Sequence, residues 1–86
     1  MASPYYFEAT RYWSQGDENA HFAWMERIPC IRGVQGELRK IFLDIDESRV
    51  TAHDIEELKA VYRRYGGELA QLDRLAATLE RNDAED

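Results

Sequence analysis

The stretch from Ile28 to Phe42 divides the chain into two parts whose apolar residues follow different periods. Before this stretch, aromatic residues alternate with polar ones, as in a β-strand; after it, apolar residues recur every three or four positions, as in an α-helix. The 86 residues are enough for one small domain. These patterns predict an α+β fold, in which an N-terminal two-stranded β-hairpin packs on two amphipathic helices and a third helix follows at the C-terminus.

The predicted hairpin covers residues 5–31. Residues 5–13 are rich in aromatic side chains, which is typical of a strand, and the polar residues 14–19 resemble a hairpin turn. Residues 20–28 fit a second strand that would pair with the first, although Phe22 and Met25 also have helical spacing, so a helix remains the alternative there. Pro29 has no N–H group to donate, and we expect it to end the hairpin.

Three helices are predicted after the hairpin, over about 34–46, 51–65 and 68–81. The second has the clearest boundaries, because Thr51 and Asp54 form a capping-box pattern and Gly66 suits a left-handed C-terminal cap. The first and third are predicted from their apolar spacing alone. Their stripes are Val34, Leu38, Ile41, Phe42 and Ile45 for the first, and Leu69, Leu72, Ala76 and Leu79 for the third. Residues 82–86 are predicted to be a frayed acidic tail, which leaves 1–81 as the domain.

The charge and the cysteine content narrow the class of partner and the compartment. A formal net charge of −6 argues against nucleic acid and anionic membranes, and suits either a basic protein surface or simple solubility. Cys30 is the only cysteine, so no intrachain disulfide forms, and we expect its thiol to be a small core hydrophobe in a reducing compartment. Residues 1–4 lack a signal-peptide pattern, and a cytoplasmic location is expected.

The sequence carries no motif for catalysis, metal binding or DNA recognition. The acidic segment between Asp44 and Ile55 has the wrong spacing for an EF-hand, and no nucleophile, phosphate loop or metal-ligand pattern is present. The predicted second helix begins with Asp54, Glu56 and Glu57, whereas a DNA recognition helix needs hydrogen-bond donors at its start. We therefore expect no enzyme activity, no metal and no cofactor.

A protein-binding role remains. Tyr, Trp and Arg dominate the energetics of protein interfaces, and the predicted hairpin is rich in them. Carboxylates on the predicted second helix add an acidic surface. The candidate partner-binding residues are Tyr5, Tyr6, Arg11, Tyr12, Trp13, Trp24, Asp54 and Glu57. Whether each aromatic residue belongs to the core or to an interface is left open by the sequence.

Four segments of the chain together carry a family resemblance: Tyr5–Ala9, Glu26–Ile31, Leu38–Phe42 and Val50–Asp54. Over residues 5–66 the chain resembles small uncharacterised bacterial proteins that are encoded beside polymorphic toxins and are taken to be immunity proteins. Residues 68–86 depart from that pattern, which would end with a short aromatic segment. The resemblance implies a protein that binds a cognate toxin, a basic domain such as a nuclease, and blocks or distorts its active site; it assigns no binding residue.

Two other functions are compatible with the sequence. The first is a phage or plasmid accessory protein whose acidic surface mimics nucleic acid, which would require carboxylates clustered on one exposed face. The second is a structural homodimer built through the third helix, which would require the apolar stripe of that helix to be exposed in the monomer. An exposed aromatic patch would instead favour the inhibitor.

Overall fold

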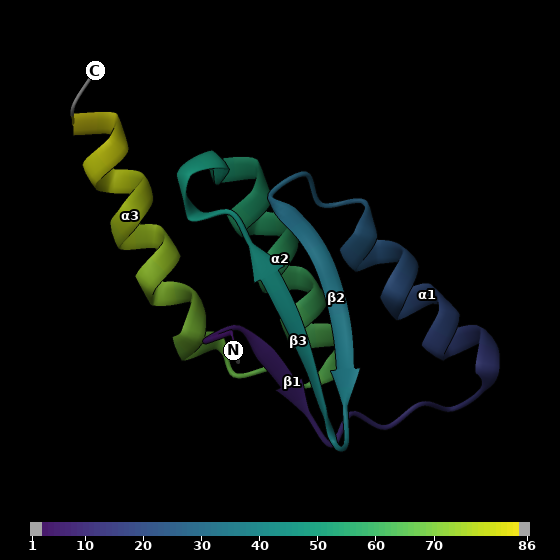
Figure 1. Ribbon diagram of the computed structural model, residues 1–86. Helices are drawn as coiled ribbons and strands as arrows, with labels where there is room; N and C mark the ends of the chain where they lie inside the picture. The colour runs from purple at the N-terminus through teal and green to yellow at the C-terminus, as the bar shows by residue number, and fades with distance from the viewer. Residues whose placement is uncertain (1–2, 85–86) are drawn as a thin grey trace.

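The computed structural model describes residues 3–84, with side chains as far as Glu80, and shows a three-stranded sheet with helices on one of its faces (Figure 1). The α+β class is confirmed, but the order of the elements differs from the predicted one. In chain order the elements are β1 (Tyr6–Glu8), α1 (Gln15–Glu26), β2 (Ile31–Glu37), β3 (Lys40–Ile45), the 3₁₀ turn η1 (Glu47–Arg49), α2 (Ala52–Tyr65), the 3₁₀ turn η2 (Leu69–Leu72) and α3 (Asp73–Ala84).

The sheet is antiparallel, with β3 between β1 and β2. β1 pairs with β3 through Phe7 opposite Ile41, although the two strands are separated by more than thirty residues of chain. β2 and β3 form a hairpin that closes with Glu37 opposite Lys40, so Leu38 and Arg39 make a two-residue turn. The register of this hairpin is shifted once, between Ile31 and Gly33.

The predicted hairpin of residues 5–31 is wrong, because residues 15–26 form helix α1. The predicted turn is the start of this helix: the Ser14 hydroxyl caps it by accepting a hydrogen bond from the Asp17 N–H at 3.2 Å. His21 and Met25, one helical turn apart, are both buried. The helical alternative for residues 20–28 therefore describes the chain better than the strand. Pro29 lies in the connection between α1 and β2, so it does not end a hairpin.

The predicted helix at 34–46 is also wrong, because these residues belong to β2 and β3. In β3, Leu43 and Ile45 are buried while Asp44 between them is exposed, which is the alternation of a strand with one covered face. The spacing of apolar residues from Val34 to Ile45 fits a helix as well, so it did not distinguish the two structures. The chain turns at Leu38, a residue type that gives no turn signal.

The second and third predicted helices are confirmed. α2 begins with the predicted capping box, in which the Thr51 hydroxyl accepts from the Asp54 N–H and the Asp54 carboxylate accepts from the Thr51 N–H, both at 3.1 Å. It ends at Gly66, whose φ of 79° gives the left-handed cap. The third helical segment is a 3₁₀ turn followed by α3, which continues to Ala84. Residues 82–84 of the predicted tail are thus helical, and residues 85–86 lie outside the described part.

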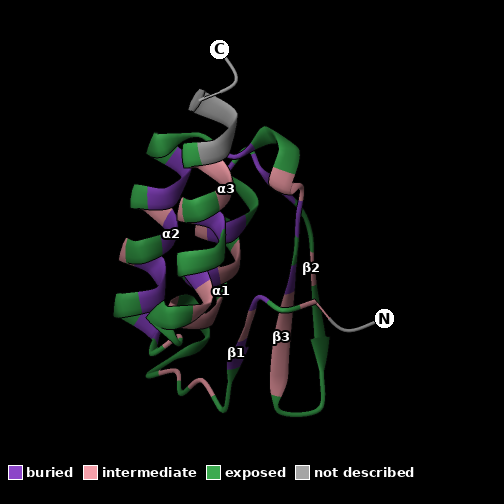
Figure 2. Cartoon of the chain, turned by 90° about the vertical axis from the view of Figure 1, so that its left-hand side faces the viewer, coloured by how far each residue is buried: buried purple, intermediate pink, exposed green. Residues whose placement is uncertain are grey.

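The core lies between the sheet and the helices, where Figure 2 shows the buried residues on the facing sides of both layers. Phe7 is at its centre: its ring centroid is 4.6 Å from those of His21 on α1 and Tyr62 on α2. Leu72 and Leu75 bring η2 and α3 into the same cluster. The other face of the sheet has no helix over it (Figure 2).

Within residues 3–84, none of the helices combines the length and the apolar character that a membrane crossing requires.

Gly67 is required by close packing, and its replacement should destabilise the fold. A Cβ atom added there would lie 2.6 Å from Cδ2 of Tyr62 and 2.8 Å from Cε1 of Phe7, both ring atoms of the core. We expect Gly67→Ala to lower the free energy of unfolding by about 1–3 kcal/mol. The measurement is urea denaturation followed by tryptophan fluorescence.

Gly36→Ala is the matched control, because nothing lies within 4 Å of a Cβ atom placed there, in strand β2. We expect this variant to be as stable as the wild type or slightly more so, because alanine suits a strand interior better than glycine. Equal stability of both variants would show that the Phe7–Tyr62 contact can move aside for an extra methyl group.

Candidate functional site

A groove of about 470 Å³ lies where three parts of the chain meet beside the β2–β3 turn. We call it the turn groove; it is lined by Ala9, Thr10, Arg11, Tyr12, Glu18, Phe22, Leu38, Arg39 and Ile41. The first four residues belong to the β1–α1 connection, the next two to α1 and the last three to the hairpin. Figure 1 shows why these parts meet: the connection leaves β1 at the end of the sheet where the hairpin turns.

Two residues in the walls of the turn groove have strained backbones. Ala9 has φ of 55° and Leu38 has φ of 56°, and among the described residues they are the two that adopt positive φ without being glycine. The Ala9 N–H donates a 2.7 Å hydrogen bond to the Arg39 carbonyl, which joins the β1 exit to the hairpin turn. Left-handed backbone costs an L-residue about 1–2 kcal/mol, and such strain concentrates at functional sites.

Of the two most exposed large apolar side chains among the described residues, one lines the turn groove and the other follows a lining residue in the chain. The Leu38 side chain is fully exposed at the hairpin turn, and Trp13, which directly follows Tyr12 in the chain, is 93% exposed. The Trp13 backbone is nevertheless fixed, because its N–H donates to the Asp17 carboxylate at 3.1 Å. Both side chains present apolar area to solvent.

Several polar groups of the turn groove have no partner in the described part of the chain. The side chains of Arg11 and Arg39 are exposed, and the described ion pairs, Arg32–Asp44, Arg64–Asp17 and Arg74–Glu47, use other arginines. Oγ1 of Thr10 is buried and makes no hydrogen bond. Glu18 supplies the one carboxylate of the lining. The lining of the turn groove thus carries two guanidinium groups and one carboxylate, and Arg39 also lines a neighbouring hollow that contains Glu8 and Glu68.

His21 lies behind the turn groove and is completely buried. Its Nδ1 is 2.7 Å from the Tyr12 hydroxyl, and its ring stacks on Tyr65 with centroids 3.9 Å apart. Nε2 has no hydrogen-bond partner in the described structure. Burial lowers the pKa of His21 to about 4, against the opposing effect of the Asp17 carboxylate. The imidazole is therefore neutral at pH 7 and acts as an aromatic core residue that supports Tyr12.

The buried neutral histidine should make folding sensitive to acid. His21 has a lower pKa when folded than when unfolded, so the unfolded chain binds more protons below pH 6.5 and stability falls as pH drops from 6.5 through 4. A pKa difference of this size corresponds to a loss of about 3 kcal/mol at most in the free energy of unfolding. Urea denaturation at pH 7, 6, 5 and 4.5 measures the loss.

His53 provides the control for this pH dependence, since it is the other histidine and its side chain is exposed in the first turn of α2. His53→Gln should keep the wild-type dependence between pH 6.5 and 4.5. His21→Gln should be less stable at pH 7 but should lose much of the dependence. A His21→Gln variant with an unchanged slope would assign the acid sensitivity to carboxylates instead.

Two of the eight predicted partner-binding residues, Arg11 and Tyr12, line the turn groove, and a third, Trp13, directly follows Tyr12 in the chain. Tyr5 and Asp54 are buried, which leaves neither available to a partner. Tyr5 belongs to the core and donates its hydroxyl to Glu47, while Asp54 completes the cap of α2.

The remaining three candidates lie elsewhere. Tyr6 is half-buried on the uncovered face of the sheet, with its ring 5.7 Å from that of Phe42 and 4.9 Å from the Lys40 ammonium. Trp24 and Glu57 are joined by a 3.1 Å hydrogen bond from the indole N–H to the carboxylate, which links α1 to α2. This pair borders a smaller hollow of about 330 Å³ on the helical side.

Sequence reasoning missed the contribution of the hairpin to the site, namely Leu38, Arg39 and Ile41. It placed these residues in a helix, where Leu38 would have been buried. The available signal was a Gly-rich, β-branched segment from Ile31 to Gly36, which disfavours a helix and fits a strand. Nothing in the sequence marks Leu38 as the turn residue.

The structure offers little for nucleophilic or metal chemistry. Cys30 is buried, and burial, together with the nearby Asp54 carboxylate, raises the pKa of its thiol to about 12, so it is not a nucleophile at neutral pH. Its expected role as a core residue is confirmed. No cluster of three or more metal-ligating side chains occurs in the part of the chain that the structure describes.

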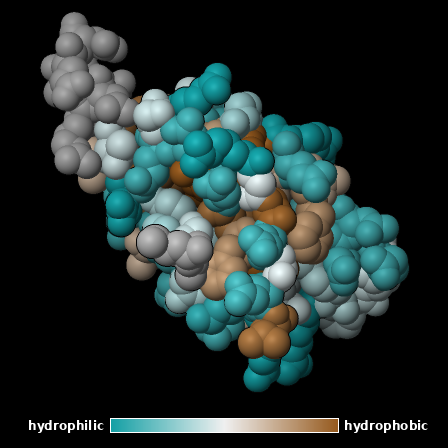
Figure 3. All heavy atoms as spheres, viewed as in Figure 1, coloured by the Kyte–Doolittle hydropathy of each residue, from teal (hydrophilic) through white to brown (hydrophobic). Residues whose placement is uncertain are grey.

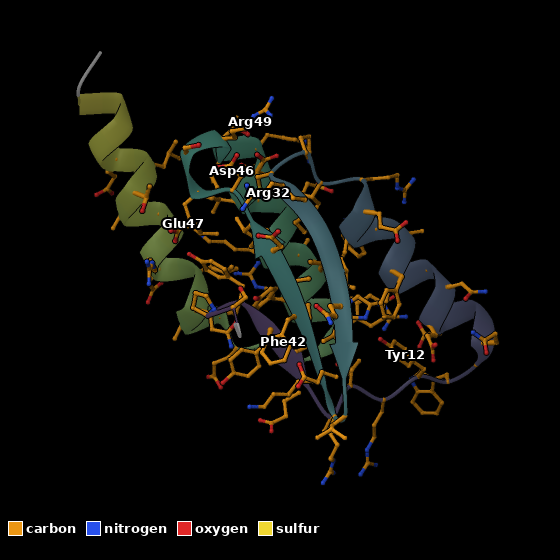
Figure 4. The ribbon with its side chains drawn as sticks, in the orientation of Figure 1. Tyr12, Arg32, Phe42, Asp46, Glu47 and Arg49 are labelled. Atoms are coloured by element: carbon orange, nitrogen blue, oxygen red, sulfur yellow. The ribbon has the colours of Figure 1, made fainter. Side chains whose placement is uncertain are left out.

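A larger hollow of about 710 Å³ runs along the uncovered face of the sheet, with Phe42 and Gly33 at its floor. Figure 3 views this face and shows apolar surface at its centre among hydrophilic side chains. Its charged groups are already paired: Glu47 accepts from Arg74 at 2.9 Å, and Asp44 from Arg32 at 3.1 Å. Figure 4 shows Glu47 on the side of β3 toward α3. The turn groove, whose two arginines have no ion-pair partner among the described residues, is therefore the stronger candidate site.

Comparison with known proteins gives no guide to this site: no protein-family model, no curated protein and no solved structure matches the chain.

Proposed function

We propose that the protein is a non-catalytic binding module that inhibits another protein by docking the turn groove, with Trp13 and Leu38, on it. The observation that carries this proposal is the full exposure of Leu38, which lines the turn groove, together with the 93% exposure of Trp13, the residue after Tyr12 in the chain. Tryptophan is among the residues that contribute most to binding energy at protein interfaces. A leucine held in open solvent contributes nothing to the core of its own domain.

The strain at Leu38 supports the same conclusion. A glycine or asparagine at the turn would remove the cost of the left-handed backbone, and a polar side chain would remove the exposed apolar surface. The chain has leucine at this turn, which costs the isolated domain both backbone strain and exposed apolar surface. A contact made outside the chain explains this choice, because the side chain is then buried on binding.

The immunity protein of a bacterial toxin is the specific case that the family resemblance suggests. A formal net charge of −6 supports it, because an acidic inhibitor is steered toward a basic toxin domain. By contrast, the stripe on which the homodimer hypothesis depends packs largely on the chain's own core: Leu72 is buried and Leu79 is partly buried against it.

Leu38→Gly tests the proposal by separating stability from binding. Glycine accepts φ of 56° without strain, so we expect this variant to be more stable than the wild type by about 1 kcal/mol in urea denaturation. We expect the same variant to retain its partner less well. The binding measurement uses the tagged protein as bait in an extract of its source cells, with quantitative mass spectrometry.

Trp13→Ala and Leu69→Ala complete the comparison. Trp13→Ala should also lose the partner, whereas Leu69→Ala removes an exposed apolar side chain that is not part of the turn groove and should retain it. The purified partner should then lose its activity when one equivalent of the wild-type protein is added. Equal retention by all four baits, or a retained partner with undiminished activity, would falsify the proposal.

Association with the partner should depend strongly on salt if the partner is basic. Long-range attraction between opposite net charges raises the association rate, and mobile ions screen it beyond about 8 Å at 0.15 M salt. We expect the association rate constant to fall by about tenfold between 0.05 and 0.5 M NaCl, with a smaller change in the dissociation rate. Stopped-flow fluorescence of the exposed Trp13 measures both, and rates independent of salt would argue against a basic partner.

A further inference from the structure

We infer that the turn groove binds a segment of the partner protein in which a carboxylate side chain stands next to an apolar one. This inference rests on the proposed binding function and adds the chemistry of the segment that enters the site. Its basis is the combination, in one groove, of an apolar wall with two guanidinium groups that have no ion-pair partner among the described residues.

The charge of the turn groove differs from that of the protein around it. Arg11 and Arg39 approach it from separate parts of the chain, the β1–α1 connection and the hairpin turn. Guanidinium groups bind carboxylates through paired hydrogen bonds and tolerate partial loss of water better than ammonium groups do. Glu18 offsets one positive charge, so the lining retains an excess of one cation and accepts an anionic group.

The rest of the turn groove is suited to an apolar neighbour of that anion. Phe22 and Ile41 are partly buried against the core and supply a firm wall, and Leu38 extends the apolar surface outward. The site thus offers a cationic rim and an apolar wall within about 470 Å³.

A carboxylate of a protein fits these observations better than the phosphates of a nucleic acid. The formal net charge of −6 repels a polyanion as a whole, whereas a single acidic side chain on a basic or neutral partner meets only the local positive charge. Steering by the net charge and docking at the turn groove therefore act at different ranges, and an acidic segment on a basic toxin domain satisfies both.

The test is a selection from a random twelve-residue peptide library displayed on phage, with immobilised full-length protein as the target. Three targets are used in parallel: the wild type, the double variant Arg11→Gln/Arg39→Gln, and the control variant Arg32→Gln/Arg49→Gln, which removes two exposed arginines outside the turn groove. Circular dichroism first establishes that all three are folded. Bound phage are then challenged with excess soluble protein. Peptides that are released by the wild type but not by the variant Trp13→Ala/Leu38→Gly are those that bind at this site.

We expect peptides bound at the site of the wild type and the control to be enriched in Asp or Glu beside Leu, Ile or Phe. A synthetic peptide from this set should bind the wild type about tenfold or more weaker when its acidic residue is changed to the corresponding amide. The unchanged peptide should bind Arg11→Gln/Arg39→Gln more weakly by the same factor. In the double variant the acidic preference should disappear while the apolar preference remains.

Each other outcome overturns the inference, and one of them also bears on the proposed function. Site-dependent peptides without acidic enrichment would contradict the carboxylate and leave the binding function intact. No site-dependent peptide at all would contradict both. Tight binding of a 20-nucleotide single-stranded DNA that depends on Arg11 and Arg39 would replace the acidic segment by a nucleic acid as the occupant.

Discussion

The contact of Phe7 with Tyr62 and His21 is the interaction on which the rest of the structure depends. β1 contains only three residues, and a strand this short gains little from its own hydrogen bonds. It is held because Phe7, its one inward side chain, packs on both α1 and α2 with ring centroids at 4.6 Å. The absence of a side chain at Gly67 makes room for this packing. One aromatic residue thus joins the sheet to both α1 and α2.

The position of β1 also determines where the candidate site forms. Because β1 pairs with β3, the chain leaves the sheet beside the β2–β3 turn, and the Ala9–Arg39 hydrogen bond fixes the two segments together. The connection to α1 then passes over the end of the sheet and carries Arg11 and Tyr12 into the lining of the turn groove. The positive φ of Leu38 is the conformation that a two-residue hairpin turn requires at its first central position, and Ala9 has a positive φ where it donates to the Arg39 carbonyl of the same turn.

The polar groups of the protein fall into two classes. Those at the uncovered face of the sheet are paired with each other, as in Arg74 with Glu47 and Arg32 with Asp44, and they stabilise local structure. At the turn groove the Tyr12 hydroxyl lies 2.7 Å from Nδ1 of His21, but Arg11 and Arg39 have no ion-pair partner among the described residues, and Leu38 beside them is exposed. A protein-binding site differs from ordinary surface in this combination, because both kinds of group gain free energy when a partner covers them.

The sequence by itself determined the elements whose signals are local. α2 was predicted correctly at both ends, because its capping box and its glycine cap are interactions between residues a few positions apart. The apolar stripe of the C-terminal helix and the burial of Cys30 were likewise readable, as were Arg11, Tyr12 and Trp13 as candidate contact residues. Only the tertiary structure decided between helix and strand for residues 15–46. Their apolar spacing fits both, and the choice depends on β3 pairing with β1 across more than thirty residues and on α1 covering the sheet. For the same reason the sequence could not show the site, since Leu38 and Arg39 reach Thr10 only after that pairing has formed.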